Sequence, residues 1–593
     1  KKSKEREKRN MKKLVSRFMA VLMAMAMVLS MSMTAFAAEA PKGTLTVNNT
    51  VAGKTLDLYQ IFTATKSGEN VAYTLNSAYE GFFQSKIADA SALTGEALSE
   101  KAYAYVNEQV GTNGDAETAK TFAKDMLGWI LDSKNNITAT KTVETTASST
   151  QISDLAYGYY LVYPKGATDT STAPGNQTYT SAASLVSITA EAATINMKSN
   201  YPTVDKKIIP AQSGSGITVG AIVDGSWEGN HQMELDDEND PEDTIAPHGA
   251  ADEKKAGDFG IGDTITYQLT SKVPDMTGYN SYTFKFSDTL SKGLDLKEVL
   301  SVKVGNTTLK AGKTGTNTYA LTYDETSRNL TVTLNDFYNS YKDREGETIT
   351  VVYTATLNKD AVIGMNPNTN KAVVEYSNDP KSDGTGTSEP SIVKVNTFDF
   401  TIFKYYLKDQ NNQNNKTALA GAEFELYKAN TAGEAADPNG KINIVDETNG
   451  VYRQATPEEA SAAGFTSAKI VSDDDGKVLV KGLKSGTYYL KETKAPDGYN
   501  KLLSDIKIEI TASYNEATGE LESYSVIYTY NGKPVTVTNN DQATSPEVPV
   551  ENKTGVQLPS TGSKGALMVT LAGIVLFGVL TASKAFGKKK ANN

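Results

Sequence analysis

Residues 398–404 read Phe-Asp-Phe-Thr-Ile-Phe-Lys, a strand pattern that ends in a charge on the apolar side. In a half-buried strand alternate side chains face the core, so Phe398, Phe400 and Ile402 share one face with Lys404. Burying a lone ammonium group is costly, because nothing in an apolar core replaces its hydration. Lys404 is therefore expected to be neutralised or paired inside a strand-rich domain.

Two other strands of this region also continue an apolar face with a polar group. Their apolar positions are Tyr488 and Leu490 in one strand and Val535 and Val537 in the other. At the same spacing come Glu492 in the first strand and Asn539 in the second. We expect Glu492 and Asn539 to meet Lys404 in the core, with Asn540 as the alternative asparagine.

The preceding region, residues 201–394, repeats this pattern with a different acid. Lys206, Asp288 and Asn370 again stand where an apolar face continues. The apolar positions on these faces are Val204 and Ile208, then Tyr282, Phe284 and Phe286, then Ala372, Val374 and Tyr376. A second trio of lysine, acid and asparagine is therefore predicted.

Such a trio is suited to forming an amide bond between two side chains. Removal from water lowers the pKa of the lysine, so that a neutral amine can attack. It also raises the pKa of the acid, which can then protonate the asparagine carboxamide. Ammonia leaves, and an isopeptide bond ties the first strand to the last. The alternative is a core salt bridge in which no covalent bond forms.

Two motifs of the third region carry a family resemblance. Residues 419–427 (LAGAEFELY) and 489–499 (YLKETKAPDGY) are similar to the Cna-B-type immunoglobulin-like module, the second of them to its E-box. The resemblance implies that Glu492 is the proton-shuttling acid. It also implies that Lys404 and Asn539 are the bonded pair.

The second region resembles the isopeptide-forming fimbrial domain of major pilins. The matching stretches are residues 202–206 (PTVDK), 287–290 (SDTL), 370–372 (NKA) and 376–378 (YSN). By this resemblance Asp288 is the catalytic acid, and Lys206 and Asn370 are the bonded pair.

The wider pattern predicts a mainly β chain of tandem immunoglobulin-like sandwiches, the first with a helical insertion. Apolar residues at helical spacing predict helices at 97–110 and 116–131. The predicted domains are residues 43–200, 201–394 and 398–540, followed by a polar, proline-containing linker at 541–557.

Both ends of the chain indicate export and anchoring. Residues 11–38 have the basic start, apolar run and small-residue cleavage site of a signal peptide. Residues 558–590 contain Leu558-Pro559-Ser560-Thr561-Gly562, an apolar span at 566–582 and a lysine cluster. That order resembles the cell-wall sorting signal of Gram-positive surface proteins, which implies sortase cleavage between Thr561 and Gly562. An ordinary membrane anchor is the alternative.

Covalent polymerisation needs an accessible lysine on the first domain, and two lysines are candidates. Tyr163-Pro164-Lys165 matches the start of the family's Tyr-Pro-Lys-Asn pilin motif, but Gly166 replaces the asparagine. Lys198 holds the place that the motif has in the family, just before the second domain, and strand alternation turns it toward solvent. We expect Lys198 to be the acceptor, with Lys165 as the alternative.

Composition excludes several classes of function. The 593 residues include two histidines and no cysteine, so a zinc site or a thiol enzyme is not expected, and no cofactor is predicted. The net charge of −11 argues against nucleic acid as a partner. The acidic run at 234–243 (ELDDENDPED) would suit calcium, but such runs are more often solvated loops.

The whole chain resembles the major backbone pilins of the SpaH/EbpB type. The resemblance implies a secreted shaft subunit of a surface pilus, which a pilin-specific sortase joins from Thr561 to the acceptor lysine of the next copy. Attachment to peptidoglycan by a housekeeping sortase, tip or base pilins as further partners, and a supporting role in adhesion are also implied. The alternative is a monomeric wall-anchored adhesin that binds a host or matrix ligand. An enzyme is not expected, because the sequence offers no catalytic triad, metal cluster or phosphate loop.

Overall fold

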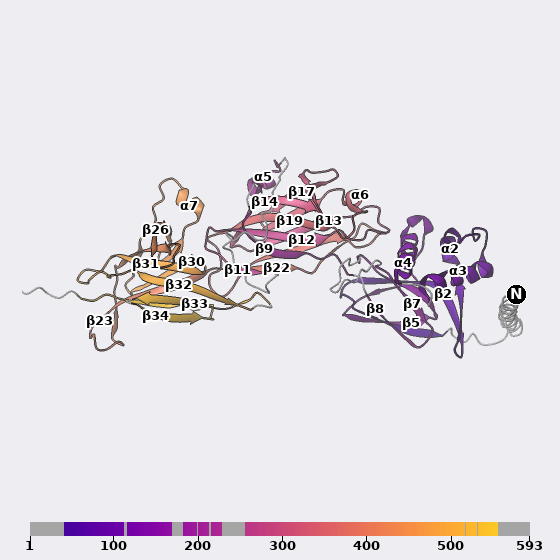
Figure 1. The fold of residues 1–593 in the computed structure, drawn as a ribbon, viewed down its shortest axis with the longest axis horizontal. Coiled ribbons are helices and arrows are strands. Elements are labelled where there is room, and N and C mark those ends of the chain that lie inside the picture. The colour runs from indigo at the N-terminus through magenta and orange to yellow at the C-terminus, as the bar shows by residue number, and fades with distance from the viewer. Residues whose placement is uncertain are drawn as a thin grey trace, which may run out of the picture. The chain divides into compact units, whose positions relative to one another are not determined.

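The computed structural model describes residues 41–554 except 112–115, 169–181, 198–199, 213–214, 228–254, 516–517 and 531. The described chain forms two compact units, each built from β-sheets (Figure 1). The first contains the described residues up to Pro202, with Pro274–Tyr282 and Ser377–Gly386. The second contains Thr203–Val273, Thr283–Tyr376 and the described residues from Thr387 onward. Two short segments of the predicted second domain therefore pack with the first.

The first unit is a β-sandwich. One sheet has the order β5-β1-β8, and the other has the order β3-β2-β6-β7 with β4 beside β2. The strands are β1 (Lys42–Asn48), β2 (Thr55–Ser67), β3 (Asn70–Leu75), β4 (Lys141–Glu144), β5 (Ser149–Ala156), β6 (Gly158–Pro164), β7 (Ser184–Ile188) and β8 (Ala192–Asn196). Leu45 and Val47 of β1 share a buried cluster with Leu56 and Leu58 of β2, which is the core between the sheets.

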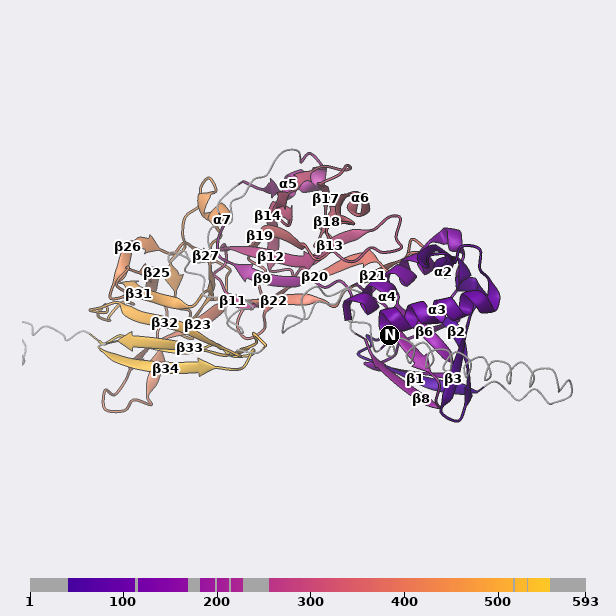
Figure 2. The ribbon, with the colours of Figure 1, turned by 45° about the vertical axis from the view of Figure 1, so that its right-hand side comes forward.

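Helices pack on the β2-containing sheet of this unit (Figure 2). They are α2 (Glu80–Lys86), α3 (Gly95–Val110) and α4 (Ala116–Leu131), with short 3₁₀ turns at Ser77–Tyr79 and Ser133–Asn135. The helices predicted at 97–110 and 116–131 are confirmed. Leu98 of α3 and Met126 of α4 are buried in one cluster with Phe62 of β2, so the apolar stripes of both helices face the sheet.

The predicted second domain lies in the second unit and consists of two packed sheets. One has the order β10-β14-β19-β12-β9, with β15 beside β14; its strands are β9 (Asp205–Ile209), β10 (Ile217–Thr218), β12 (Thr264–Lys272), β14 (Leu294–Val304), β15 (Thr307–Thr308) and β19 (Thr348–Leu357). The other has the order β11-β22-β20-β13-β18-β17-β16, with β21 beside β20; its strands are β11 (Ala256–Asp258), β13 (Phe284–Leu290), β16 (Lys310–Ala311), β17 (Thr318–Asp324), β18 (Asn329–Leu334), β20 (Asn368–Ser377), β21 (Thr385–Thr387) and β22 (Ser391–Asn396). Two short helices, α5 (Val219–Asp224) and α6 (Phe337–Tyr341), lie in its connections.

The third domain, also in the second unit, is another pair of sheets. One has the order β24-β23-β30-β28-β27, with β35 beside β23; its strands are β23 (Phe398–Leu407), β24 (Lys416–Ala418), β27 (Ile444–Asp446), β28 (Val451–Gln454), β30 (Lys477–Leu483) and β35 (Glu547–Glu551). The other has the order β26-β25-β31-β32-β33-β34, with β29 beside β25; its strands are β25 (Glu423–Ala429), β26 (Ala436–Lys441), β29 (Ile470–Val471), β31 (Gly486–Lys494), β32 (Ile506–Tyr514), β33 (Leu521–Tyr530) and β34 (Lys533–Asn539). The short helix α7 (Pro457–Ser461) follows β28.

The strand β35 corrects the predicted linker at 541–557. It pairs in parallel with β23, placing Lys404 opposite Val550, so the domain continues past residue 540. Pro546 and Pro549 gave this stretch the composition of a linker. Proline is tolerated in β35 because this strand lies at a sheet edge, where an amide donor can be missing.

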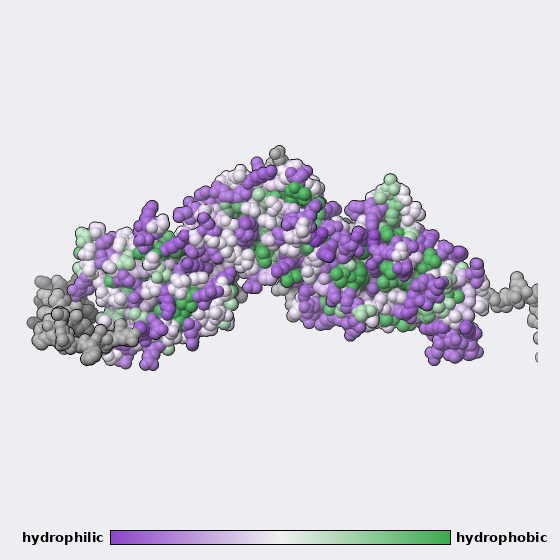
Figure 3. Space-filling model, turned by 180° about the vertical axis from the view of Figure 1, so that it is seen from behind, coloured by the Kyte–Doolittle hydropathy of each residue, from purple (hydrophilic) through white to green (hydrophobic). Residues whose placement is uncertain are grey.

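Polar side chains dominate the face seen in Figure 3, with apolar ones gathered in small groups. The described helices are all too short or too polar to span a membrane. The predicted signal peptide, the sorting signal from Leu558 to Gly562, the apolar span, the acidic run and Lys198 lie outside the described residues.

Candidate isopeptide sites

The first candidate site lies between the two sheets of the second domain. Lys206 of β9 and Asp288 of β13 form an ion pair, and their side chains are 0% and 1% exposed. Asn370 of β20 is also fully buried, and its amide donates a 2.7 Å hydrogen bond to the Tyr353 hydroxyl. Lys206 Nζ donates to the same hydroxyl at 2.5 Å. The lysine, acid and asparagine expected from alternation therefore lie together.

Strand register explains this meeting. The neighbouring strands β13 and β20 pair Asp288 with Ala372 and Leu290 with Asn370. Asp288 and Asn370 are thus diagonal neighbours on one face of a sheet, the relation in which cross-strand side chains touch. Lys206 reaches them from the opposing sheet, where β9 pairs with β12.

Burial drives both ionisable groups of this site toward their neutral forms. It lowers the pKa of Lys206, although the Asp288 carboxylate opposes this effect, and it raises the pKa of Asp288 despite the nearby lysine. The aromatic rings of Tyr267 and Tyr353 enclose the amine, each centroid lying 4.9 Å from Nζ. Transfer of the lysine proton to the carboxylate would leave a nucleophilic amine next to a protonated acid.

The second candidate site lies in the third domain. Lys404 of β23 and Glu492 of β31 form an ion pair of 2.9 Å between Nζ and Oε1, and both side chains are 0% exposed. The second oxygen of Glu492 accepts a 2.7 Å hydrogen bond from the backbone N–H of Leu502. Burial lowers the pKa of Lys404, against the effect of Glu492. This lysine and glutamate were both expected from alternation.

Asn552, which follows β35, is the asparagine at this site. Its amide donates to Glu492 Oε2 at 3.1 Å and to the carbonyl of Asn500 at 2.9 Å, and the residue is 1% exposed. Its backbone N–H bonds to the carbonyl of Tyr405, next to Lys404, because β35 runs beside β23. The carboxamide is thus held next to the lysine–glutamate pair by the sheet itself.

Asn539, the asparagine expected from the sequence, does not join this group. Its amide donates to the Tyr524 hydroxyl at 3.1 Å and to the Thr544 carbonyl at 2.9 Å, and the alternative, Asn540, is exposed. The physical reason is that β34 is the edge strand of its sheet, where β32 and β33 separate it from β31, the strand that carries Glu492.

The signal for Asn552 was present in the sequence. Val548 and Val550 are 0% and 1% exposed, and Asn552 continues their face at the same spacing. The alternation rule that identified Lys404 and Glu492 therefore identifies Asn552 as well, once 547–551 is recognised as a strand.

Both arrangements have the parts that amide formation needs. An amine with a lowered pKa, a carboxyl group and a carboxamide share a site from which water is excluded. The carboxamide oxygens of Asn370 and Asn552 have no hydrogen-bond partner among the described residues, so each can accept a proton when the carbonyl carbon is attacked.

Lys165, the alternative acceptor for polymerisation, lies directly after β6 in the first unit. Its ammonium group is 3.1 Å from an Asp379 oxygen and 3.4 Å from an Asp57 oxygen, and its side chain is 27% exposed. Burial acts to lower the pKa of Lys165, but the two carboxylates outweigh it and raise the pKa. Both ion pairs would have to break before this amine could attack, which argues against Lys165 as the acceptor.

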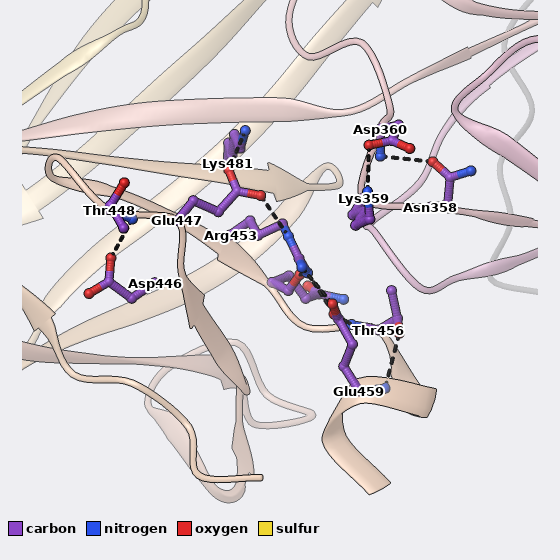
Figure 4. A network of polar contacts seen from close by, with 11 residues as sticks. Asn358, Lys359, Asp360, Asp446, Glu447, Thr448, Arg453, Thr456, Glu459 and Lys481 are labelled. Carbon is purple, nitrogen blue, oxygen red and sulfur yellow. Dashed lines mark hydrogen bonds and ion pairs between the residues drawn. The ribbon is translucent and has the colours of Figure 1, made fainter. Parts of the chain in front are cut away.

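A third polar cluster surrounds Arg453, which is 4% exposed (Figure 4). Its guanidinium donates to Glu447 at 2.8 Å and, through two nitrogens, to Glu459 at 2.6 Å each, while Lys481 pairs with Glu447 at 2.6 Å. These charges satisfy one another and hold α7 against the sheet. Within the described ranges, histidine and acidic side chains form no group suited to a metal ion.

Two segments of the chain match known protein families. Residues 261–380 match the Gram-positive pilin backbone subunit 2, Cna-B-like domain. Residues 406–524 match the SpaA prealbumin-like fold domain. The matches cover most of the second and third domains, where the two candidate sites lie.

Two curated relatives are similar over about half of the chain. The trypsin-resistant surface T6 protein of Streptococcus pyogenes serotype M6 is 25% identical over 315 residues, 50% of this chain and 50% of that protein. Fimbrial subunit type 2 of Actinomyces naeslundii is 25% identical over 350 residues, 56% of this chain and 58% of that protein. The chain thus spans about half the length of the curated relatives it matches.

Several solved structures are also similar to this chain. The T6 backbone pilin of serotype M6 Streptococcus pyogenes is 16% identical, with a TM-score of 0.42. The superposed region covers 88% of this chain and 100% of the pilin chain. The full-length major pilin SpaD from Corynebacterium diphtheriae is 16% identical, with 87% and 98% covered and a TM-score of 0.37. On its two family matches and its curated relatives, the chain is similar to the backbone pilins of Gram-positive bacteria.

Proposed function

We propose that this protein is a structural shaft subunit of a covalently polymerised surface pilus. The observation that carries the proposal is the presence of two buried lysine–acid–asparagine sites. One lies in a domain that matches the Gram-positive pilin backbone family, and the other lies in a domain that matches the SpaA prealbumin-like family. A buried ion pair alone adds little to stability, since desolvation offsets its attraction. The recurrence of an asparagine beside each pair points to chemistry instead.

Within each subunit, one isopeptide bond joins Lys206 to Asn370 in the second domain. In the third domain the bond joins Lys404 to Asn552, which replaces the expected Asn539. Asp288 is the acid in the first case and Glu492 is the acid in the second. Each bond forms once with loss of ammonia, so the chain modifies itself without turnover and needs no cofactor.

Between subunits, a pilin-specific sortase cleaves after Thr561 and transfers its carbonyl to the amine of Lys198 on the next copy. Lys165 remains the alternative, disfavoured by its two carboxylate partners. Joining one end of a subunit to a different place on its neighbour is a heterologous contact, which grows into an open filament. A housekeeping sortase then attaches the polymer to peptidoglycan, with tip or base pilins as further partners and adhesion as the supported role.

The internal bonds are tested by the intact mass of the purified protein. We expect wild type to be lighter than its sequence mass by two ammonia molecules. Asp288→Ala and Glu492→Ala should each restore one ammonia, and the double variant both. A wild-type mass equal to the sequence mass would leave two core salt bridges and no crosslinks.

Polymerisation is tested on cell-wall material released enzymatically from the native host and separated on a denaturing gel. We expect a high-mass ladder that survives boiling in detergent and collapses in Lys198→Ala, while Lys165→Ala keeps it. Collapse in Lys165→Ala alone would reassign the acceptor. A single monomer-sized band in wild type would favour the monomeric wall-anchored adhesin, which shares the internal bonds but needs no acceptor.

A further inference from the structure

We propose that Tyr353 is a catalytic residue of the second-domain site, where its hydroxyl relays a proton from the attacking amine of Lys206 to the departing nitrogen of Asn370. This inference rests on the proposed isopeptide bond between Lys206 and Asn370. It assigns a role to a residue that strand alternation can mark only as part of the core.

The geometry places the Tyr353 oxygen between the two nitrogens that exchange places in the reaction. Lys206 Nζ donates to it at 2.5 Å and Asn370 Nδ2 donates to it at 2.7 Å. Tyr353 lies on β19 and is 0% exposed, and its ring stacks on Tyr267 with centroids 5.2 Å apart. The stack fixes the hydroxyl in position, and burial excludes water that could carry the proton instead.

The third-domain site explains why a relay is needed here. There, Glu492 reaches both reacting nitrogens: one oxygen is 2.9 Å from Lys404 Nζ, and the other accepts from Asn552 Nδ2 at 3.1 Å. In the second domain the acid is the shorter Asp288. Its Oδ2 contacts Lys206, its carboxyl group also interacts with the Tyr353 hydroxyl, and its Oδ1 has no hydrogen-bond partner among the described residues. The Asn370 nitrogen is instead bonded to Tyr353.

The reaction forms one C–N bond, breaks another and releases ammonia. The Lys206 ammonium first passes a proton to Asp288, and the neutral amine forms a bond to the Asn370 side-chain carbonyl carbon as Asp288 protonates the Asn370 oxygen. The new C–N nitrogen then gives a proton to the Tyr353 oxygen while the Tyr353 hydroxyl gives its own proton to the Asn370 nitrogen. Ammonia leaves, the oxygen returns its proton to Asp288, and Tyr353 is unchanged.

The protonation state of Tyr353 suits this relay. Burial, together with the charge of Asp288, raises the pKa of Tyr353 well above its usual value. The phenol therefore keeps its proton at neutral pH and can donate and accept in one step. General acid–base groups of this kind contribute roughly 100-fold or more to a rate.

The test is a time course of bond formation in Tyr353→Phe, which keeps the ring and removes only the hydroxyl. After proteolysis, crosslinked peptides that contain Lys206 and Asn370 are quantified by mass spectrometry against those that contain Lys404 and Asn552. We expect second-domain bond formation to slow by about 100-fold, so that fresh protein retains one ammonia, while the third-domain bond of the same molecules forms normally.

The matched control is Tyr267→Phe. Its hydroxyl is buried in the same stack and interacts with Asn370, but no hydrogen bond among the described residues joins it to Lys206, so it does not connect the two nitrogens. We expect this variant to form both bonds at the wild-type rate. Equal slowing in the two variants would overturn the assignment to Tyr353, as would a wild-type rate in Tyr353→Phe.

Two further measurements distinguish a loss of the relay from a folding defect and from the absence of the proposed bond. Asp288→Ala and Asp288→Ala/Tyr353→Phe, which both lack the chemistry, should melt within a few degrees of each other. A much lower melting temperature of the double variant would make Tyr353 a structural residue and overturn the relay. A wild-type protein that never loses the second-domain ammonia would instead disprove the bond on which the inference rests.

Discussion

The two candidate sites use the same three functional groups but distribute them differently over the sheets. In the second domain the acid and the asparagine lie on neighbouring strands, β13 and β20, and the lysine approaches from the facing sheet. In the third domain the lysine lies on β23, the asparagine directly follows its parallel neighbour β35, and the acid faces them from the other sheet. A bond in the second domain would therefore join two sheets, and a bond in the third would join two strands of one sheet.

The two sites differ in the length of the acid side chain, which determines how each site is assembled. Glu492 is long enough to touch both nitrogens, so the third-domain site is complete with three residues. Asp288 is one methylene shorter, and a fourth residue, Tyr353, lies between the lysine and the asparagine. The same overall reaction is thus supported by two arrangements of donors.

The largest expected effect comes from removing each asparagine. Asn370→Ala and Asn552→Ala should each retain the lysine–acid pair but lose one bond. A crosslink that closes a loop of this length stabilises by about 5 kcal/mol in the chain-entropy description. We expect each variant to gain back its own ammonia-equivalent mass and its own domain to melt at a lower temperature in calorimetry.

Asn539→Ala is the matched control for Asn552→Ala, because both asparagines are buried in the third domain. It removes hydrogen bonds to Tyr524 and Thr544 but should leave both crosslinks in place. Loss of the third-domain bond in Asn539→Ala rather than in Asn552→Ala would reverse the assignment made from the structure.

The role of acid length can be tested directly in the third domain. Glu492→Asp shortens the acid of the third domain, which has no tyrosine hydroxyl bonded to the Asn552 amide among the described contacts. We expect bond formation there to slow by about 100-fold, the contribution typical of a positioned acid–base group. The second-domain bond in the same molecules serves as the reference, and an unchanged ratio of the two crosslinked peptides would refute the role of acid length.

A smaller effect is expected at Arg453, whose cluster of charged partners lies within the third domain. Arg453→Met removes three charge-assisted hydrogen bonds but leaves two partly exposed glutamates that water can solvate. We expect a loss of about 2 kcal/mol in the unfolding free energy of the third domain. Lys359→Met, on an exposed side chain, is the control and should change little. A shift of the second-domain transition in Arg453→Met would mean that the two domains unfold as one.

The smallest effect concerns pH and is complete only when the second-domain bond is absent and Lys206 can titrate. In Asn370→Ala, folding raises the pKa of Asp288, so stability should fall as the pH rises from about 4 through the raised value. Folding lowers the pKa of Lys206, so stability should rise again between that lowered value and about 10.4. Melting temperatures at acidic, neutral and alkaline pH test this sequence. Wild type, in which the bond has consumed Lys206 but not Asp288, should lack the rise at alkaline pH.

Strand alternation predicted five of the six residues at the two sites because they lie on regular strands with one buried face. It failed at Asn539 because β34 is an edge strand on which Val535 is 43% exposed, so its apparent apolar face is not a core face. The strand that carries the correct asparagine was hidden by Pro546 and Pro549. Tyr353 could not be singled out, since an aromatic residue in a strand has the same pattern whether or not its hydroxyl has a partner.

Features that depend on distant contacts were beyond any local pattern. Pro274–Tyr282 and Ser377–Gly386 follow strands of the second domain yet pack with the first unit. One of them supplies Asp379, a partner of Lys165 that lies more than two hundred positions away in sequence. The ion pair of Lys165 could therefore be found only in the folded structure, whereas its motif is visible in the sequence.

The positions of the two proposed bonds also determine how far the chain can be stretched. Force applied along the backbone would enter at Thr203, cross from Lys206 to Asn370, continue to Lys404 and leave from Asn552. The stretches between the bonded residues, about 160 and 150 residues long, would bear no tension and could not extend. Without the bonds, each could unfold and lengthen the chain by roughly 500 Å. A filament of such subunits would keep nearly constant length under a pull, because most of its polypeptide lies outside the line of force.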